Sequence, residues 1–110
     1  MKAANKNVNI TDLKPEMKEF IAHLELALGR ELVITSGYRS PSHPIEAKKA
    51  SPGEHSEGLA VDVACIQPIS FLEVVGEAYK LGAKRIGVSR KSKFVHIGLS
   101  PDRPSSLWTY

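Results

Sequence analysis

Apolar residues recur at helical spacing in the first third of the chain. They follow the i, i+3, i+4, i+7 pattern of one helix face, which predicts an amphipathic helix over residues 12–28. Thr11 or Asp12 is expected to cap its start, and Gly29 its end, because glycine tolerates the left-handed backbone found there. The predicted buried face consists of Met17, Phe20, Ile21, Leu24 and Leu28.

A second helix is predicted over residues 70–82. Ser70 and Glu73 form a capping-box pattern at its start, in which the two side chains satisfy backbone amides of the first turn. The spacing of three large side chains predicts the face that is buried: Leu72, Val75 and Tyr79.

Short apolar runs predict strands elsewhere. In the run 59–64, the alternation of side chains places Asp62 on the face opposite the large apolar residues, and in the run 94–99 it does the same for His96. Two adjacent strands would bring Asp62 and His96 side by side. We therefore predict an α+β fold, a small antiparallel sheet with flanking helices, with strands at 32–35, 59–64, 85–89 and 94–99.

Residues 37–57 are predicted to form a long loop. Three prolines, Gly53 and several serines break any periodicity, and only a helical turn near residues 45–50 is expected. Long ordered loops in small domains are more often functional than not. We therefore expect this loop to form one wall of a site.

Length and composition indicate one globular domain. A chain of 110 residues, 42% hydrophobic and 25% charged, can bury one core but not two, so we expect a single domain over residues 1–110 and exclude a multidomain enzyme. The one cysteine, Cys65, excludes a disulfide framework and a thiolate-rich zinc site. The net charge of +3 suits an anionic partner without requiring nucleic acid. We expect the protein to be a monomer.

The first residues of the chain do not resemble a secretory signal, and the sequence predicts no membrane span. Residues 1–9 lack the apolar stretch of a secretory signal, and no run approaches the roughly 20 apolar residues of a membrane span. We expect a protein made in the cytoplasm without a signal peptide and without membrane insertion. The tail, residues 100–110, is expected to lie across the surface, held down by Trp108 or Tyr110.

His55, Asp62 and His96 form a candidate metal-binding set. His55 stands seven residues before Asp62, which is enough chain to turn back and direct its imidazole toward the same strand. Two histidines and one carboxylate with an open position are the ligand set of a catalytic zinc, whereas structural zinc sites usually have four protein ligands. The same spacing also fits a buried Asp–His contact without a metal, so spacing alone leaves both open.

Three ordered segments resemble the motifs of one enzyme family. Residues 36–41 read S-G-Y-R-S-P, residues 53–62 read G-E-H-S-E-G-L-A-V-D, and residues 94–96 read F-V-H. They are similar to the S-G-Y-R-S-P, S-x-H-x-x-G-x-A-x-D and F-V-H motifs of the zinc D-alanyl-D-alanine carboxypeptidase and L-alanyl-D-glutamate endopeptidase family, which includes phage endolysins. The likeness extends over about residues 32–99, and Gly53 replaces the usual serine.

The resemblance implies a zinc peptidase with a fold related to the Hedgehog signalling domain. It implies His55, Asp62 and His96 as ligands of Zn²⁺ and peptidoglycan stem peptides as the substrate. Arg39 corresponds to the arginine of the first motif, and its guanidinium can hold a substrate carboxylate or stabilise an oxyanion. By analogy, a short chain without a wall-binding module fits a phage lytic enzyme that reaches the cell wall, in the periplasm, through a membrane lesion.

One position departs from the family pattern. Many members place a glutamate or aspartate three residues before the last histidine ligand as general base, and this chain has Lys93 there. A lysine ammonium cannot accept the proton. Three alternatives follow: Glu57, or after it Glu54, serves as the base; zinc and Arg39 support slow hydrolysis without a dedicated base; or the domain binds zinc or peptidoglycan without peptidase activity.

A basic segment close to His96 leaves one further alternative. It can attract the carboxylates of stem peptides or the phosphates of wall polymers. A nucleic-acid-binding domain is the rival explanation, but neither an aromatic–basic sheet pattern nor a recognition-helix pattern occurs, so we expect no nucleic-acid partner. The segment comprises Lys84, Arg85, Arg90, Lys91 and Lys93.

Overall fold

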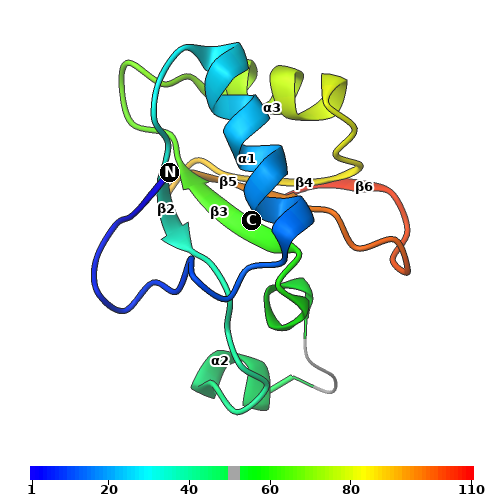
Figure 1. Cartoon of the computed structure of the whole chain (residues 1–110). Coiled ribbons are helices and arrows are strands. Elements are labelled where there is room, and N and C mark those ends of the chain that lie inside the picture. Colours follow the sequence, from blue (N-terminus) through cyan, green and yellow to red (C-terminus); the bar gives the residue numbers. More distant parts are fainter. Residues whose placement is uncertain (50–52) are drawn as a thin grey trace.

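The computed structural model describes residues 1–49 and 53–110 (Figure 1). It confirms the prediction of a mixed α+β fold. Residues 50–52, which include the end of the helical turn predicted near 45–50, lie outside the described residues. The strands are β1 (Lys2–Ala3), β2 (Val33–Ser36), β3 (Ala60–Ala64), β4 (Arg85–Ser89), β5 (Phe94–Gly98) and β6 (Ser106–Thr109). The helices are α1 (Pro15–Leu28), α2 (Pro44–Ala47), the 3-10 helix η1 (Glu54–Glu57) and α3 (Phe71–Lys80).

The strands form one mixed sheet in the order β1-β2-β3-β5-β4-β6. The four predicted strands make up its antiparallel centre, β2-β3-β5-β4. The prediction of a wholly antiparallel sheet is wrong at both edges, where β1 runs parallel to β2 and β6 runs parallel to β4. Both edge strands are short, and each pairs with a strand that is distant in the sequence. The residues of β1 and β6 therefore carry little local pattern from which a strand, or its direction, could be predicted.

α1 and α3 cover one face of the sheet, and the core lies between them and the strands (Figure 1). Because side chains alternate along a strand, committing one face of β3 and β5 to this core leaves the other face for polar residues. The core includes the predicted α1 residues Met17, Phe20, Ile21 and Leu24 and the sheet residues Ile34, Val61, Val63, Val95 and Ile97.

The helix ends agree with the sequence in two of three cases. Gly29 ends α1 with a φ of +70°, and Ser70 Oγ accepts the Glu73 backbone N–H at 3.0 Å at the start of α3. The predicted caps of α1 are wrong: the helix begins at Pro15, and the residue before it makes no side-chain capping bond. Asp12 instead pairs with an asparagine in the preceding turn. Proline is well suited to a first helical position, because its φ is already helical.

The predicted buried face of α3 is right at Val75, which packs partly buried against the core, and wrong at its other two positions. Leu72 and Tyr79 are 82% and 69% exposed, whereas Val74 and Ala78 are buried. Positions 71, 74, 75 and 78 have the same helical spacing as the predicted set, so periodicity alone permits either face. Packing of α3 against α1 and β5 selects the second set.

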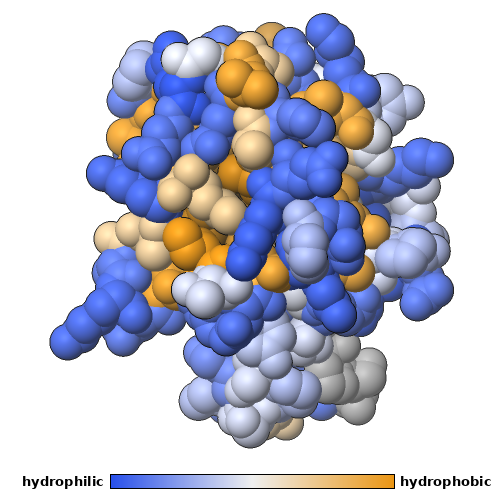
Figure 2. Space-filling model, in the orientation of Figure 1, coloured by the Kyte–Doolittle hydropathy of each residue, from blue (hydrophilic) through white to orange (hydrophobic). Residues whose placement is uncertain are grey.

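The surface is largely polar. Figure 2 shows hydrophilic side chains over most of one face, with apolar side chains exposed between them. Within the described part of the chain, no helix is long and apolar enough to cross a membrane.

Candidate metal centre

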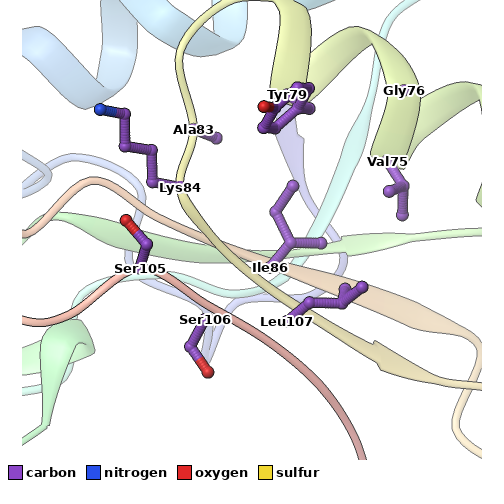
Figure 3. A pocket seen from close by; sticks show the side chains of 9 residues that line it. All are labelled: Val75, Gly76, Tyr79, Ala83, Lys84, Ile86, Ser105, Ser106 and Leu107. Carbon is purple, nitrogen blue, oxygen red and sulfur yellow. The ribbon is translucent and has the colours of Figure 1, made fainter.

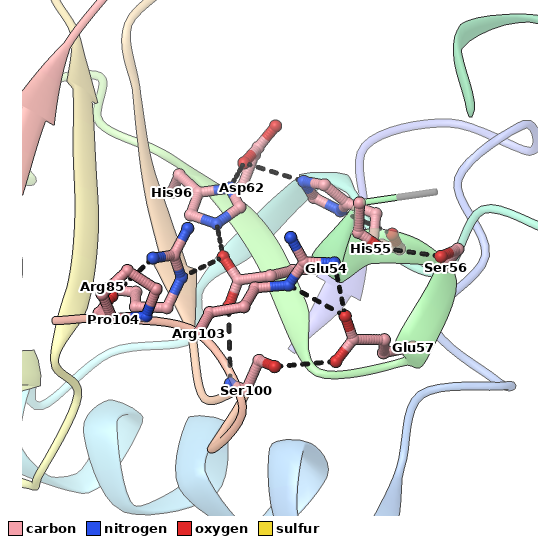
Figure 4. Close-up of polar contacts among 12 residues, drawn as sticks. Glu54, His55, Ser56, Glu57, Asp62, Arg85, His96, Ser100, Arg103 and Pro104 are labelled. Carbon is pink, nitrogen blue, oxygen red and sulfur yellow. Dashed lines mark hydrogen bonds and ion pairs between the residues drawn. The ribbon is translucent and has the colours of Figure 1, made fainter. Parts of the chain in front are cut away.

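Three buried side chains, from η1, β3 and β5, meet on the polar face of the sheet (Figure 4). Asp62 Oδ1 lies 3.4 Å from His55 Nε2 and 3.1 Å from His96 Nδ1. One donor atom from each residue lies within 4.8 Å of the others. The structure therefore brings together the three residues that the sequence analysis selected as candidate ligands.

The register of the sheet and a turn at Gly58 place these side chains. Asp62 of β3 pairs with His96 of β5, and both side chains point away from the core. His55 reaches them from η1, which ends at Gly58 with a φ of +73°. A Cβ at Gly58 would also approach the backbone nitrogen of Lys14 to 3.2 Å, so glycine is favoured there by both backbone angle and space.

Each imidazole has its outer nitrogen held by a neighbour. His55 Nδ1 lies 2.8 Å from the carbonyl oxygen of Gly37, which can only accept, so Nδ1 donates and Nε2 faces Asp62. His96 Nε2 lies 3.0 Å from Glu54 Oε1, and Nδ1 faces Asp62. Outer partners of this kind fix the tautomer and orientation of metal-binding histidines.

The donor atoms fit a zinc ion. Ligand atoms of a tetrahedral zinc, each about 2.0–2.1 Å from the metal, are about 3.3 Å apart. The two separations from Asp62 Oδ1, 3.4 Å to His55 and 3.1 Å to His96, are close to that value. Two imidazoles and one carboxylate leave a position open, as catalytic zinc sites do. Both the chemistry and the spacing of the donors thus suit zinc.

Opposite charges stabilise the ionised state of the buried groups. Burial alone would raise the pKa of Asp62, but the hydrogen bonds and charges of His55 and His96 outweigh it and lower the pKa to about 2. Burial alone would lower the pKa of His96, but Asp62 and Glu54 raise it above its ordinary value. The pKa of Glu54 is lowered despite its burial, because His96 and Arg85 bind its carboxylate. Both carboxylates are therefore charged at neutral pH.

A line of paired residues continues the site across the sheet. His96 pairs with Gly87 of β4, and Gly87 pairs with Trp108 of β6. Because Gly87 has no side chain, the indole of Trp108 lies over it and approaches the His96 ring to a centroid distance of 5.1 Å. The sequence analysis expected Trp108 only to hold the tail down. The strand-favouring residues Trp108, Thr109 and Tyr110 were the available signal for a strand there.

Arg39 lies at the same site and is held by Glu46 of α2. Its Nε is 3.1 Å from Glu46 Oε2, and the Glu46 side chain is fully buried. The same carboxylate binds Lys49 Nζ at 3.1 Å and accepts the Gly53 backbone N–H at 2.7 Å. Glu46 therefore fixes both the arginine and the start of η1 relative to α2.

These side chains line a cleft of about 600 Å³. Its walls combine the three candidate ligands with cationic groups and with aromatic rings. Phe94 and Tyr110 contact each other with ring centroids 5.1 Å apart. The cationic residues are Arg39, Lys49, Arg85 and Arg103, and the aromatic ones are Phe94, Trp108 and Tyr110.

The two carboxylates considered as general base occupy different places. Glu57 accepts from Ser100 Oγ at 2.8 Å and pairs with Arg103 Nη2 at 2.7 Å, and it is not among the residues that line the cleft. Glu54 does line the cleft and contacts His96. The structure thus places the second choice of the sequence analysis, and not the first, against a candidate ligand. A catalytic role of Glu57 stays a prediction.

The basic segment divides into two parts. Lys93 is exposed in the turn between β4 and β5, where its φ is +58°, and it does not line the cleft. Arg90 and Lys91 are exposed in the same turn. Arg85 points inward instead, with Nε 2.8 Å from Glu54 Oε1. The lysine at the family's base position is therefore a surface residue.

A second hollow, of about 630 Å³, lies between α3, β4 and β6 (Figure 3). Val75, Ile86 and Leu107 are among its lining residues, and it shares no lining residue with the cleft at the candidate metal centre. The candidate metal ligands and Arg39 line the cleft and not this second hollow.

The sequence matches the model of a known protein family. The family model described as Peptidase M15 matches residues 1–98. The matched range includes His55, Asp62 and His96 and ends before β6, so Trp108 and Tyr110 lie outside it. A search of curated proteins found no match.

Proposed function

This chain belongs to the Peptidase M15 family, and on that premise we propose that it is a zinc metallopeptidase that hydrolyses amide bonds in peptidoglycan stem peptides. The observation that carries the proposal is the buried meeting of His55 Nε2, Asp62 Oδ1 and His96 Nδ1 at the wall of a cleft. A cleft of about 600 Å³ is large enough for a short peptide segment.

The three candidate ligands hold the metal in this proposal. Zinc bound there supplies Lewis-acid polarisation of the scissile carbonyl and activation of a water molecule. Asp62 and His96 extend from paired strands, and His55 is fixed through Gly37, so the donors are held in place by the fold. Donors carried by rigid elements need little rearrangement to bind.

Arg39 orients the substrate. Among the described residues its Nε contacts Glu46, and its terminal guanidinium nitrogens can bind a substrate carboxylate or the oxygen that becomes negative in the transition state. Lys49, held by the same glutamate, adds a second positive charge to this wall. Stem peptides carry carboxylates, which these cations attract.

Proton transfer is the step in which this chain departs from its family. Glu57 would have to leave Arg103 and Ser100 to accept a proton in the cleft. We therefore propose hydrolysis that depends on the metal and Arg39 and proceeds without a dedicated carboxylate base. A general base typically contributes about 10²- to 10⁴-fold, so we expect a slow enzyme.

Digestion of purified peptidoglycan tests the peptidase. With one zinc bound per chain, mass spectrometry of the released fragments should show new amino and carboxyl termini within the stem peptides. The products should disappear with a chelator and with the His96→Ala variant. Release of terminal D-alanine indicates a carboxypeptidase, and cleavage after L-alanine indicates an endopeptidase. Zinc binding without any new terminus would reject the enzyme.

A non-catalytic zinc or peptidoglycan-binding domain is the second candidate. The surface position of Lys93 favours it, because the residue at the family's base position cannot serve the cleft. This candidate predicts that the protein sediments with peptidoglycan and leaves it uncut. The less favoured alternative, a nucleic-acid-binding domain, predicts steeply salt-dependent binding to DNA or RNA that survives a chelator.

The biological setting is proposed by analogy with the family. We propose a monomer with a Hedgehog-related fold that acts on the bacterial cell wall, as phage endolysins do. Addition of the protein to intact and to membrane-permeabilised bacteria tests this setting. Lysis of the permeabilised cells alone is expected of an enzyme that needs a membrane lesion to reach the wall.

A further inference from the structure

Glu54 is a buried carboxylate to which the proposed reaction assigns no role. Its side chain is 3% exposed, and its Oε1 lies 2.8 Å from Arg85 Nε and 3.0 Å from His96 Nε2. Its Oε2 accepts the Ser100 backbone N–H at 3.4 Å. Figure 4 shows the carboxylate between the ring of His96 and the guanidinium of Arg85. A charge buried to this degree is stable only with such partners.

The sheet leaves space for this carboxylate. Gly98 of β5 lies against it, and a Cβ at Gly98 would overlap the carboxylate atoms of Glu54. Gly98 has no positive φ, so space and not backbone angle requires glycine there. Arg85 is itself fixed, because it donates to the carbonyl oxygen of Pro104 at 2.6 Å and lies 5.3 Å from the ring centre of Trp108. Glu54 is therefore held from β4, β5 and the tail.

The position of Glu54 determines which hydrogen bonds the ring of His96 can make. Its Nδ1 lies 3.1 Å from Asp62 Oδ1, and its Nε2 lies 3.0 Å from Glu54 Oε1. An ionised carboxylate only accepts hydrogen bonds. A neutral His96 with its hydrogen on Nε2 keeps its bond to Glu54 and presents the lone pair of Nδ1 to the metal centre.

We propose that Glu54 is a positioning residue that selects the tautomer and ring orientation of His96 and so preforms the zinc site. The inference rests on the proposed zinc site and concerns metal affinity before catalysis. Outer partners of metal-binding histidines typically account for about 10- to 100-fold in metal affinity. We expect a loss of that size when the carboxylate of Glu54 is removed.

Zinc affinity in matched variants tests the proposal. Glu54→Ala should bind zinc about 10- to 100-fold more weakly than the unchanged protein. Glu54→Gln should lose less, because its amide oxygen can still accept from Nε2. The control is Glu25→Gln, which makes the same charge change at a glutamate of α1 that binds the amino terminus and the Leu32 backbone N–H, away from the cleft, and its zinc affinity should be unchanged. Unchanged affinity in both Glu54 variants would overturn the proposal.

A second measurement keeps the test decisive if Glu54→Ala does not fold. Side-chain ¹⁵N spectra of the metal-free protein, recorded at a pH where His96 is neutral, should show hydrogen on Nε2 in the unchanged protein. Hydrogen on Nδ1 would overturn the proposal without any metal being present. If instead the unchanged protein shows the Nε2 tautomer and binds no zinc, the proposed zinc function fails and the role of Glu54 in orienting His96 stands.

Discussion

Trp108 packs its indole ring against the imidazole of His96, with the ring centroids 5.1 Å apart and the ring planes inclined by 51°. The contact crosses β4 at Gly87, where there is no side chain to separate the rings. Trp108 is the only tryptophan in the sequence, and it lies beyond the part that matches the family. The indole therefore both shapes the cleft and reports on the candidate metal centre.

Adding a methyl group at Gly87 should displace this indole. A Cβ there would overlap Trp108, so Gly87→Ala should shift the tryptophan emission to longer wavelength as the ring becomes more exposed. It should also weaken zinc binding several-fold, because His96 loses the ring that packs on it. Fluorescence and zinc titration measure both effects.

Gly76→Ala is the matched control for this change. Gly76 lies in α3, and a Cβ there meets no atom within 4 Å. Its emission and zinc affinity should equal those of the unchanged protein, and its stability should rise by about 1 kcal/mol, because alanine favours a helix. An unshifted emission spectrum in Gly87→Ala would contradict the packing described.

Removing any one candidate ligand should abolish stoichiometric zinc. His55→Ala, Asp62→Ala and His96→Ala each leave two donors, too few for a stable site. Metal content after dialysis gives the answer directly. His23→Ala, at an exposed position on α1, is the control and should retain one zinc per chain. A variant of the set that keeps its zinc takes that residue off the ligand list.

The role of Glu57 is decided by its isosteric amide. Glu57→Gln should retain zinc and lose less than about tenfold in the rate of peptide release, because Glu57 is engaged with Ser100 and Arg103 outside the cleft. Rates on soluble peptidoglycan fragments measure this. A loss of about 10²- to 10⁴-fold with zinc still bound would identify Glu57 as the general base after all.

Acid should weaken the attachment of α2 through Glu46. Burial would raise the pKa of Glu46, but the Gly53 amide, Lys49 and Arg39 outweigh it, so the pKa in the folded state lies below the ordinary value of 4.5. A lowered folded pKa means that this contribution to stability is present above about pH 4.5 and is lost as the pH falls through the folded value.

Urea unfolding of Glu46→Gln checks the sign of this dependence. At pH 7 the variant should be less stable than the unchanged protein by about 2 kcal/mol, a typical contribution of hydrogen bonds to a charged group. The difference should shrink as the pH falls below 4.5. A difference that stays constant down to pH 3 would show that the charge of Glu46 contributes nothing.

The central strands and the three candidate ligands could be predicted because each depends on a local pattern. Alternation along β3 and β5 assigns Asp62 and His96 to the polar face, whichever elements surround the strands. His55 follows from its short separation from Asp62 and from the motif around it. The face of α3 could not be predicted in the same way, because two sets of positions satisfy the helical period and only packing against α1 chooses between them.

The chain's own order of apolar, polar and motif residues thus determined that an α+β domain would carry two histidines and an aspartate at one place. The tertiary structure alone decided what surrounds them. The sequence offers Glu54 only as the second candidate for a general base, in a loop, and Gly87 only as a glycine within a predicted strand. They acquire roles only because the sheet order sets β5 between β3 and β4 and adds β6 at the edge, which brings Glu54 against His96 and Trp108 over Gly87. Contacts of this kind depend on strands distant in sequence, and no local period encodes them.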